Sequence, residues 1–250
     1  MVGDYLVNQI RSLLSFLTIL PVGKEYEINY IARHMFLFPA AGAIIGLIIG
    51  SFAFGLSFIM QGLFVGLITT AALFILTGAY HTDALSDFAD GLMAKGSKDS
   101  KRKAMRDPSA GSAGVAALVL YLAGAVIAVS GLTGKGGYGL FAAILVSEVI
   151  AKYVMVLQAN RGIAAWEGIG SPFTQQMKNK AKLAAASAIT VPIVYFMGGL
   201  GGLYALGAAV VIAFVLLRIA NRSFGGVSGD VFGASNEITR LSSLIILVSI

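Results

Sequence analysis

The stretch at residues 78–96, "GAYHTDALSDFADGLMAKG", places three aspartates and one histidine directly after an almost uncharged apolar run. If a helix continues through it, Asp83, Asp87 and Asp90 occupy positions i, i+4 and i+7 and share one face. Three carboxylates on one face repel each other, and a divalent cation among them removes that repulsion. Oxygen ligands without thiolate suit a hard ion such as Mg²⁺, which typically takes one or two carboxylates plus phosphate oxygens. The spacing therefore predicts a Mg²⁺ site that also binds a diphosphate.

Two alternatives stay open for this stretch. The acids could belong to a solvated helix end, where they balance the lysines that follow. Against this, they share one face, and uncompensated charge at a membrane boundary is costly. His81 lies about one turn before the acids and off their stripe. A catalytic role and an ordinary hydrogen-bonded structural role are equally open for it.

Basic residues that could bind phosphate follow directly. Six of them lie between Lys95 and Arg106, and most of these are explained by contact with the inner leaflet. Arg106 and Asp107 differ because they adjoin "PSAGSAGV", where glycines and free N–H groups at a helix start would favour an anion. Asp107 could instead be a plain helix cap.

Further candidates lie later in the chain. Arg161 follows a long apolar run, and a guanidinium group binds phosphate in a bidentate manner. Arg218 and Arg222 are one turn apart, before the glycine-rich segment "GGVSGDVFGASNE". Asp230 in that segment is another candidate carboxylate for metal or substrate. We expect these three arginines to act as phosphate clamps.

The surrounding composition is that of a membrane protein. Of 250 residues, 57% are hydrophobic and only 12% are charged, whereas soluble domains carry roughly 25% charge. Several apolar runs approach the ~20 residues that span a bilayer. The chain has no cysteine, which excludes thiolate metal sites, and we expect no cleavable leader because the first residues lack the basic, apolar and small-residue pattern of one. We expect one all-α, polytopic integral-membrane catalytic domain over residues 1–250.

The apolar pattern predicts six to seven transmembrane helices. The first 20 residues are interrupted by Asn8, Gln9 and Arg11, which favours an interfacial or re-entrant helix ended by Pro21. The last apolar run is too short to cross unless its helix begins earlier, near Val231. The predicted spans cover residues 36–60, 62–80 with a helical continuation through the aspartates, 112–131, 138–158, 183–199, 203–220 and 241–250.

Charge sets the predicted orientation. Numbering the connections alternately leaves Lys135 alone on one side, while the other side receives nearly all remaining Lys and Arg residues, from Arg11 and Lys24 to Arg240. By the positive-inside rule the crowded side is cytoplasmic, and the acids gather there too. Glu148 and Lys152 form an i, i+4 pair inside an apolar run, where they could serve a function or simply neutralise each other.

Four motifs together resemble a known family. "FLTILPV", "HTDALSDFADG", "MRDPSAGSAGV" and "GGVSGDVFGASNE" occur in the order found in the cobalamin 5′-phosphate synthase, or adenosylcobinamide-GDP ribazoletransferase, family. The resemblance runs from about Phe16 to Glu237. Ala84 departs from it, because the family usually has glycine after the first aspartate of the cluster. "ANRGIAAWEGIG", which contains Arg161, matches only loosely.

The resemblance implies a Mg²⁺-dependent plasma-membrane transferase that joins adenosylcobinamide-GDP to α-ribazole or its 5′-phosphate and releases GMP. A ribose hydroxyl would attack the phosphorus on the corrinoid side, with Asp90 or His81 accepting its proton. Asp83, Asp87 and Asp90 would carry Mg²⁺. The expected partners are these substrates and the bilayer, without nucleic acid, and the chain could form homo-oligomers.

Two other functions were weighed. "DFADG" is a fragment of the D-x-x-D-G pattern of membrane CDP-alcohol phosphotransferases, but the rest of that signature is absent. A cation transporter could use the same acids as a pathway. Transporters, however, tend to place ionisable residues near the bilayer midplane, whereas here the acids gather at one end.

Overall fold

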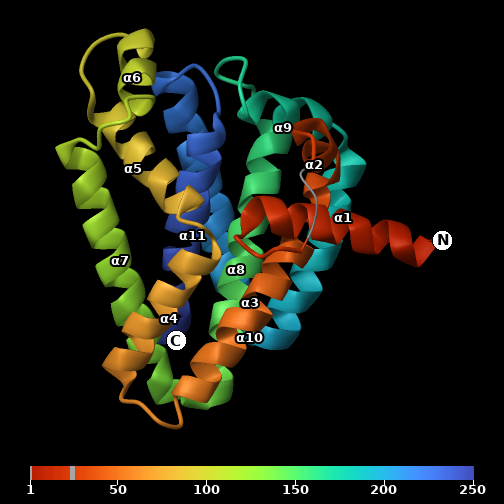
Figure 1. Ribbon diagram of the computed structural model, residues 1–250, viewed down its shortest axis with the longest axis vertical. Helices are drawn as coiled ribbons and strands as arrows, with labels where there is room; N and C mark the ends of the chain where they lie inside the picture. Colours follow the sequence, from red (N-terminus) through yellow and green to blue (C-terminus); the bar gives the residue numbers. More distant parts are fainter. Residues whose placement is uncertain (1, 23–25) are drawn as a thin grey trace.

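The computed structural model describes residues 2–22 and 26–250, so Lys24 lies outside the described residues (Figure 1). The described part is helical throughout, and its only β-type contact is a single bridge between Ala164 and Val227. The helices are α1 (Val2–Leu17), α2 (Ile28–His34), η1 (Met35–Leu37), α3 (Phe38–Leu56), α4 (Gly62–Leu76), α5 (Tyr80–Met93), α6 (Lys98–Met105), α7 (Ser112–Leu132), η2 (Thr133–Lys135), α8 (Gly136–Arg161), α9 (Gly170–Gln176), α10 (Lys180–Ser223) and α11 (Gly229–Ser249).

The predicted all-α membrane fold is confirmed. Four helical stretches are long and apolar enough to cross a bilayer: Ile28–Leu56, Ser112–Arg161, Lys180–Ser223 and Gly229–Ser249. The pair α4–α5 makes a fifth if it is taken as one bent span. Two stretches, of 50 and 44 residues, are each bent at a glycine with positive φ, Gly136 and Gly199. The number of crossings, six to seven, stays a prediction.

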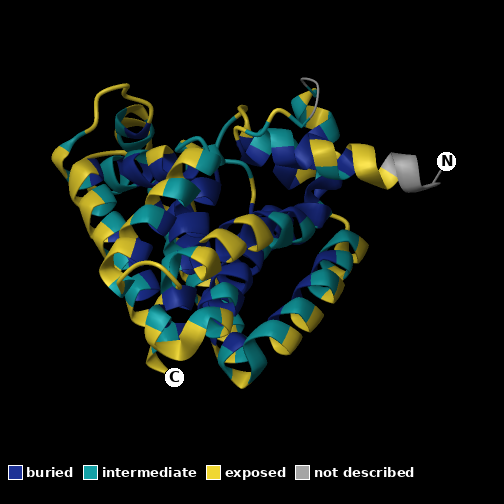
Figure 2. Cartoon of the chain, turned by 60° about the horizontal axis from the view of Figure 1, so that its bottom comes forward, coloured by how far each residue is buried: buried dark blue, intermediate teal, exposed yellow. Residues whose placement is uncertain are grey.

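Helix α8 is the central helix of the bundle, and most of its side chains are buried. Glycines let α3 approach it closely: a Cβ atom at Gly42 or Gly46 would lie 2.7 Å from the backbone of Glu148 or Leu145. This repeat of a small residue every fourth position is how helices pack in lipid. Buried residues line the interior of the bundle and exposed residues its periphery (Figure 2).

The first and last helices, α1 and α11, can be compared with the predictions made for the two ends of the sequence. Helix α1 runs across the other helices, and its 16 residues are fewer than the roughly 20 that span a bilayer, as expected of an interfacial or re-entrant segment (Figure 1). Helix α11 begins at Gly229, because Ser228 caps it by accepting a hydrogen bond from the Val231 N–H at 3.3 Å. The start predicted near Leu241 is therefore too late, and of the two alternatives left open the earlier start near Val231 is the one that the structure shows. Arg240 lies buried within α11, so its placement on the cytoplasmic surface was wrong.

The predicted continuous helix through the aspartates is wrong. Helix α4 ends at Leu76, α5 begins at Tyr80, and the two axes differ by 91°. Gly78 and Ala79 between them both have left-handed backbones, with φ of 62° and 60°. An L-residue in that conformation cannot continue a right-handed helix and costs roughly 1–2 kcal/mol. Because α5 leaves α4 at this angle and carries three aspartates in 14 residues, it does not simply prolong the apolar helix α4.

We expect Gly78→Ala to destabilise the turn that aims α5. The new Cβ would sit in a left-handed backbone and lie 2.9 Å from side-chain atoms of both Ile19 and Tyr80. The free energy of unfolding should fall by at least roughly 1–2 kcal/mol, measured by SDS titration of the purified protein in mixed micelles. Ala79→Gly is the matched control, which should be neutral or stabilising. Equal stability of Gly78→Ala and the wild type would contradict this description of the break.

Candidate active site

Helix α5 is held between α7 and α11 at the end of the bundle that also carries α6 (Figure 1). Glycines on both neighbours make this possible. A Cβ at Gly233 of α11 would lie 2.4 Å from the Cβ of Ala84, and a Cβ at Gly114 of α7 would lie 2.3 Å from Ser86 Oγ. The residue that departs from the family pattern, Ala84, is thus accommodated by a glycine on the facing helix.

Three of the predicted acids lie on one helix, α5, and Asp230 of α11 acts on Asp87 together with them. Asp83 is exposed, while Asp87, Asp90 and Asp230 are partly buried. Burial, and to a smaller extent repulsion from Asp83, Asp230 and Asp90, raises the pKa of Asp87 to about 6. We call these four residues the acidic face. The raised pKa of Asp87 indicates that basic residues do not fully compensate the negative charge of the acidic face.

The acidic face fits Mg²⁺ in donor chemistry. All its donors are carboxylate oxygens, which suit a hard cation. Within residues 2–22 and 26–250, no three His, Asp or Glu side chains converge closely enough to form a complete metal site. Mg²⁺ typically takes only one or two protein carboxylates and completes its shell with water and phosphate oxygens. These donors are compatible with part of a Mg²⁺ coordination shell, and the Mg²⁺ site itself stays a prediction.

Asp90 joins two helices. Its Oδ2 accepts a hydrogen bond from the Gly111 N–H at 2.7 Å, and its Oδ1 accepts one from the Gly114 N–H at 2.9 Å. Asp90 thus caps the N-terminus of α7 from the neighbouring helix. The alternative that Asp107 caps this helix is wrong, because its Oδ1 accepts from the Ser109 N–H at 2.9 Å. In the sequence, only the spacing of Gly111 and Gly114, three residues apart, could have pointed to this contact.

His81 is 7% exposed, and its Nδ1 has no hydrogen-bond partner among the described residues. It lies in the first turn of α5 and lines a pocket of about 380 Å³. Asp230, at the start of α11, lines the same pocket. The structure therefore brings together two site residues that the sequence predicted separately. A buried ring nitrogen without a hydrogen-bond partner is unusual and marks His81 as a candidate functional residue.

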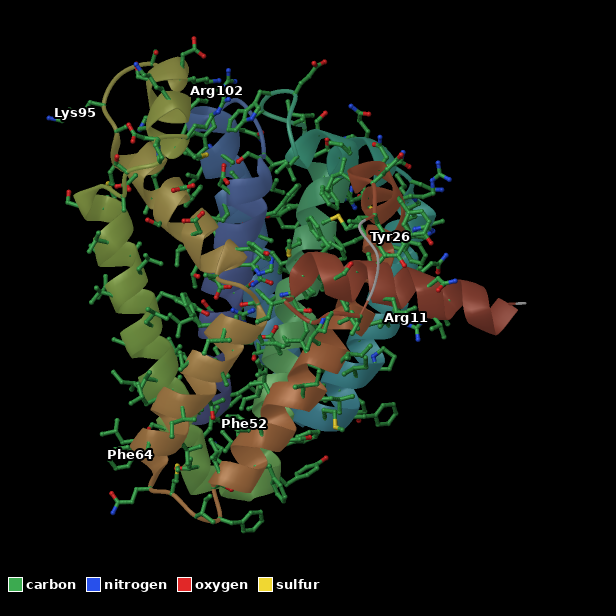
Figure 3. All side chains as sticks on the ribbon, viewed as in Figure 1. Arg11, Tyr26, Phe52, Phe64, Lys95 and Arg102 are labelled. Carbon is green, nitrogen blue, oxygen red and sulfur yellow. The ribbon has the colours of Figure 1, made fainter. Side chains whose placement is uncertain are left out.

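Arg106 and Asp107 line a surface hollow of about 560 Å³, together with Arg102, Lys103 and Trp166. The guanidinium of Arg102 lies 5.7 Å from the centre of the Trp166 ring, and its Nε donates to the Phe224 carbonyl at 2.7 Å. Figure 3 shows Arg102 and Lys95 at the end of the bundle that carries α6. Burial is the main cause that raises the pKa of Asp230, and the positive charge of Arg106 in this hollow partly opposes that rise.

The other predicted clamps are not gathered at the acidic face. Arg161, Arg218 and Arg222 are exposed, and none of them lines either the pocket with His81 or the hollow with Arg106. In the described part of the chain, no side-chain hydrogen bond or ion pair fixes any of the three. Their role as phosphate clamps stays a prediction.

In the glycine-rich segment "GGVSGDVFGASNE", the backbone N–H groups of Gly226 and Val227 are already paired and so are not free to bind phosphate. The Gly226 N–H donates to the Ala220 carbonyl, and the Val227 N–H donates to the Ile163 carbonyl at 2.8 Å. Gly226 is needed because a Cβ there would lie 2.4 Å from the Ile163 carbonyl oxygen. The first bond ties the segment before α11 to the end of α10, and the second ties it to the residues that follow α8.

A buried charge cluster, which the sequence revealed only in part, lies deeper in the bundle. It comprises Glu148, Lys152, Glu237 and Arg240, each at most 2% exposed. Arg240 pairs with both Glu148 and Glu237. Lys152 Nζ lies 3.7 Å from Glu148 and donates to Asn236 Oδ1 at 2.7 Å. Arg240 also donates to the Tyr121 hydroxyl at 3.0 Å. Two acids and two bases balance each other, so the Glu148–Lys152 pair is half of a neutral cluster that joins α8 to α11.

Comparison with known proteins agrees with the motifs. A family model described as cobalamin-5-phosphate synthase matches residues 9–248. An adenosylcobinamide-GDP ribazoletransferase of Methanocella arvoryzae is 34% identical, with 96% of this chain and 94% of that protein aligned. Proteins of the same name from Archaeoglobus fulgidus and Pyrococcus abyssi are 33% and 31% identical, over 96% and 95% of this chain and 96% and 97% of their own lengths. No solved structure matches the chain.

Proposed function

This chain belongs to the cobalamin-5-phosphate synthase family, and from that premise we propose that it joins adenosylcobinamide-GDP to α-ribazole, or its 5′-phosphate, and releases GMP. The single observation that carries the proposal is the acidic face on α5, flanked by a basic hollow and by the pocket with His81. A diphosphate substrate needs these elements, because its charge must be neutralised while nucleophile and leaving group are held in line.

We propose that Asp83 and Asp87 hold Mg²⁺, with Asp230 as the nearest further carboxylate. When bound there, the ion would neutralise charge on the diphosphate. Both oxygens of Asp90 already accept backbone hydrogen bonds, so its main contribution is to fix α7 against α5. Arg106 and the adjoining hollow are suited to the phosphate of the leaving GMP.

The transfer is a substitution at phosphorus. A ribose hydroxyl oxygen of the acceptor forms a bond to the phosphorus on the corrinoid side, and the bond from that phosphorus to the bridging oxygen breaks. GMP leaves with the bridging oxygen and its electron pair. His81 is the better placed proton acceptor, because its Nδ1 is unpartnered whereas both oxygens of Asp90 are engaged.

The family match and the named relatives do not support a CDP-alcohol phosphotransferase or a cation transporter. The direct test is purified protein in detergent with adenosylcobinamide-GDP, α-ribazole and Mg²⁺, watched for GMP. We expect GMP and the joined corrinoid in equal amounts. GMP release that does not depend on α-ribazole, or no release from fully folded protein, would contradict the proposal.

Mg²⁺ should be required, and its binding should weaken in acid. Removal of divalent ions with EDTA should stop turnover, and Mg²⁺ should restore it. Because the pKa of Asp87 is raised to about 6, its carboxylate binds a proton as the pH falls through that value, and Mg²⁺ must then displace it. The Mg²⁺ concentration for half-maximal rate should rise by up to roughly tenfold per pH unit below 6. A half-maximal concentration that does not change between pH 8 and 5 would contradict this assignment.

We propose a multi-pass plasma-membrane location with the acidic face toward the cytoplasm. Helix α6, with its cluster of basic residues, lies at the same end of the bundle as α5, and the positive-inside rule assigns that end to the cytoplasm (Figure 1). Accessibility of a cysteine introduced in place of Ser100, to a membrane-impermeant reagent in intact cells and in lysed cells, tests the orientation. Labelling of intact cells would refute it.

A further inference from the structure

The pocket next to the acidic face is walled by aromatic rings. Phe16, Phe38, Phe173 and Phe232 come from four different helices, α1, α3, α9 and α11, and all line it. Phe173 lies at the centre of the group, with ring centres 5.7 Å from Phe16, 6.1 Å from Phe38 and 6.4 Å from Phe232. We call this site, with His81 and Asp230 at its polar side, the aromatic pocket.

The lining favours a flat and largely apolar ligand. Three of the four rings are nearly or fully buried, and Met35 and Met155 add polarisable sulfur atoms. Aromatic rings bind other aromatic rings by offset or edge-to-face contacts at such distances. The polar lining residues are few: Ser15 on α1, Tyr80 and His81 on α5, and Asp230 on α11. Pockets for small ligands have this form, mostly apolar with a few polar groups that fix orientation.

The volume and polarity of the aromatic pocket decide which part of the substrates it can bind: the corrin ring, the guanine or the base of the acceptor nucleoside. The volume of about 380 Å³ is at the low end of the range of roughly 300–1,000 Å³ for ligand pockets, too small for a corrin ring with its side chains. Guanine carries donors and acceptors around most of its edge, which four phenyl rings cannot satisfy. A bicyclic aromatic base attached to a ribose fits both the volume and the lining.

We infer that the aromatic pocket binds the base of the acceptor nucleoside, so that its ribose lies beside His81 and Asp230 at the acidic face. The inference rests on the proposed function, because it assigns one substrate of that reaction. Asp230 belongs both to the pocket and to the acidic face, which gives the ribose hydroxyl a direct route to the diphosphate. The base is thereby held apart from the hollow lined by Arg106.

The test replaces two rings while preserving apolar character. Phe16→Leu/Phe173→Leu removes two of the four rings, and Phe52→Leu/Phe64→Leu is the control at exposed positions away from the pocket (Figure 3). We expect the pocket variant to raise the KM for α-ribazole by about tenfold or more. The KM for adenosylcobinamide-GDP should be unchanged, and the control should resemble the wild type. Circular dichroism and size-exclusion chromatography establish that each variant is folded.

Binding measured without turnover separates this inference from the proposed function. Equilibrium dialysis of wild-type protein with radiolabelled α-ribazole alone should show saturable binding that the pocket variant weakens. Such binding without any GMP release would refute the proposed function and leave the pocket assignment standing. An unchanged KM and unchanged binding in the folded variant would overturn the assignment. So would a rise in the KM for adenosylcobinamide-GDP instead, or a lipid acyl chain retained in the pocket that α-ribazole does not displace.

Discussion

Asp87→Asn should reduce the rate of GMP release by about a thousandfold or more, because losing one metal ligand costs several kcal/mol of transition-state stabilisation. Asparagine keeps the size of the side chain and removes the charge that three other carboxylates repel. The folded state raises the pKa of Asp87, so its ionised form costs folding free energy above pH 6. Without Mg²⁺ at pH 7.5, the variant should therefore be at least as stable as the wild type.

This combination of lost turnover and retained stability distinguishes a functional acid from a structural one. Asp83→Asn should behave in the same way, since Asp83 is exposed and makes no structural contact in the described part of the chain. Glu27→Gln is a suitable control, because Glu27 is also exposed and its side chain caps no helix. Wild-type turnover in Asp87→Asn would end the metal assignment, whatever the stability of the variant.

Arg240→Met should produce the largest loss of stability among single substitutions in this chain. It leaves Glu148 and Glu237 buried without their shared partner, and breaking such a buried pair costs about 3–5 kcal/mol. Arg11→Met, on the exposed face of α1, should have little effect. The measurement is SDS titration in mixed micelles, with the fraction of protein that inserts into the membrane as a second readout.

A second substitution tests whether charge balance is the cause. Arg240→Met/Glu237→Gln removes one base and one acid, and leaves Glu148 paired with Lys152 at 3.7 Å. We expect it to recover a substantial part of the loss, because fewer buried charges remain unpaired. If the double variant is no more stable than Arg240→Met, the cluster acts through packing and the explanation from charge is wrong.

The sequence predicted those features that depend on local pattern. Apolar runs gave the membrane helices, and the spacing of Asp83, Asp87 and Asp90 gave their common helix. The break at Gly78–Ala79 escaped it, because the helical pattern of apolar and acidic residues continues across both positions and only the backbone conformation interrupts it. The space around Gly78, where an added Cβ would meet Ile19 and Tyr80, cannot be read from composition either.

Contacts between distant segments account for the rest. Asp90 meets Gly111 and Gly114 only after α5 has turned against α7, and Arg240 meets Glu148 across the interface of two helices. The aromatic pocket draws its four rings from helices spread over the whole chain. Asp230 was predicted as a candidate carboxylate, but its place beside both His81 and the acidic face depends on the packing of α11 on α5.

The most direct measurement is electron paramagnetic resonance of Mn²⁺ in place of Mg²⁺, on purified protein with adenosylcobinamide-GDP present. The account predicts one bound ion per chain, coupled to phosphorus nuclei of the diphosphate, and loss of that signal in both Asp83→Asn and Asp87→Asn. Equal Mn²⁺ binding in the wild type and both variants, or full turnover with no ion bound, would contradict the claim that the acids of α5 bind a cation that also binds the diphosphate.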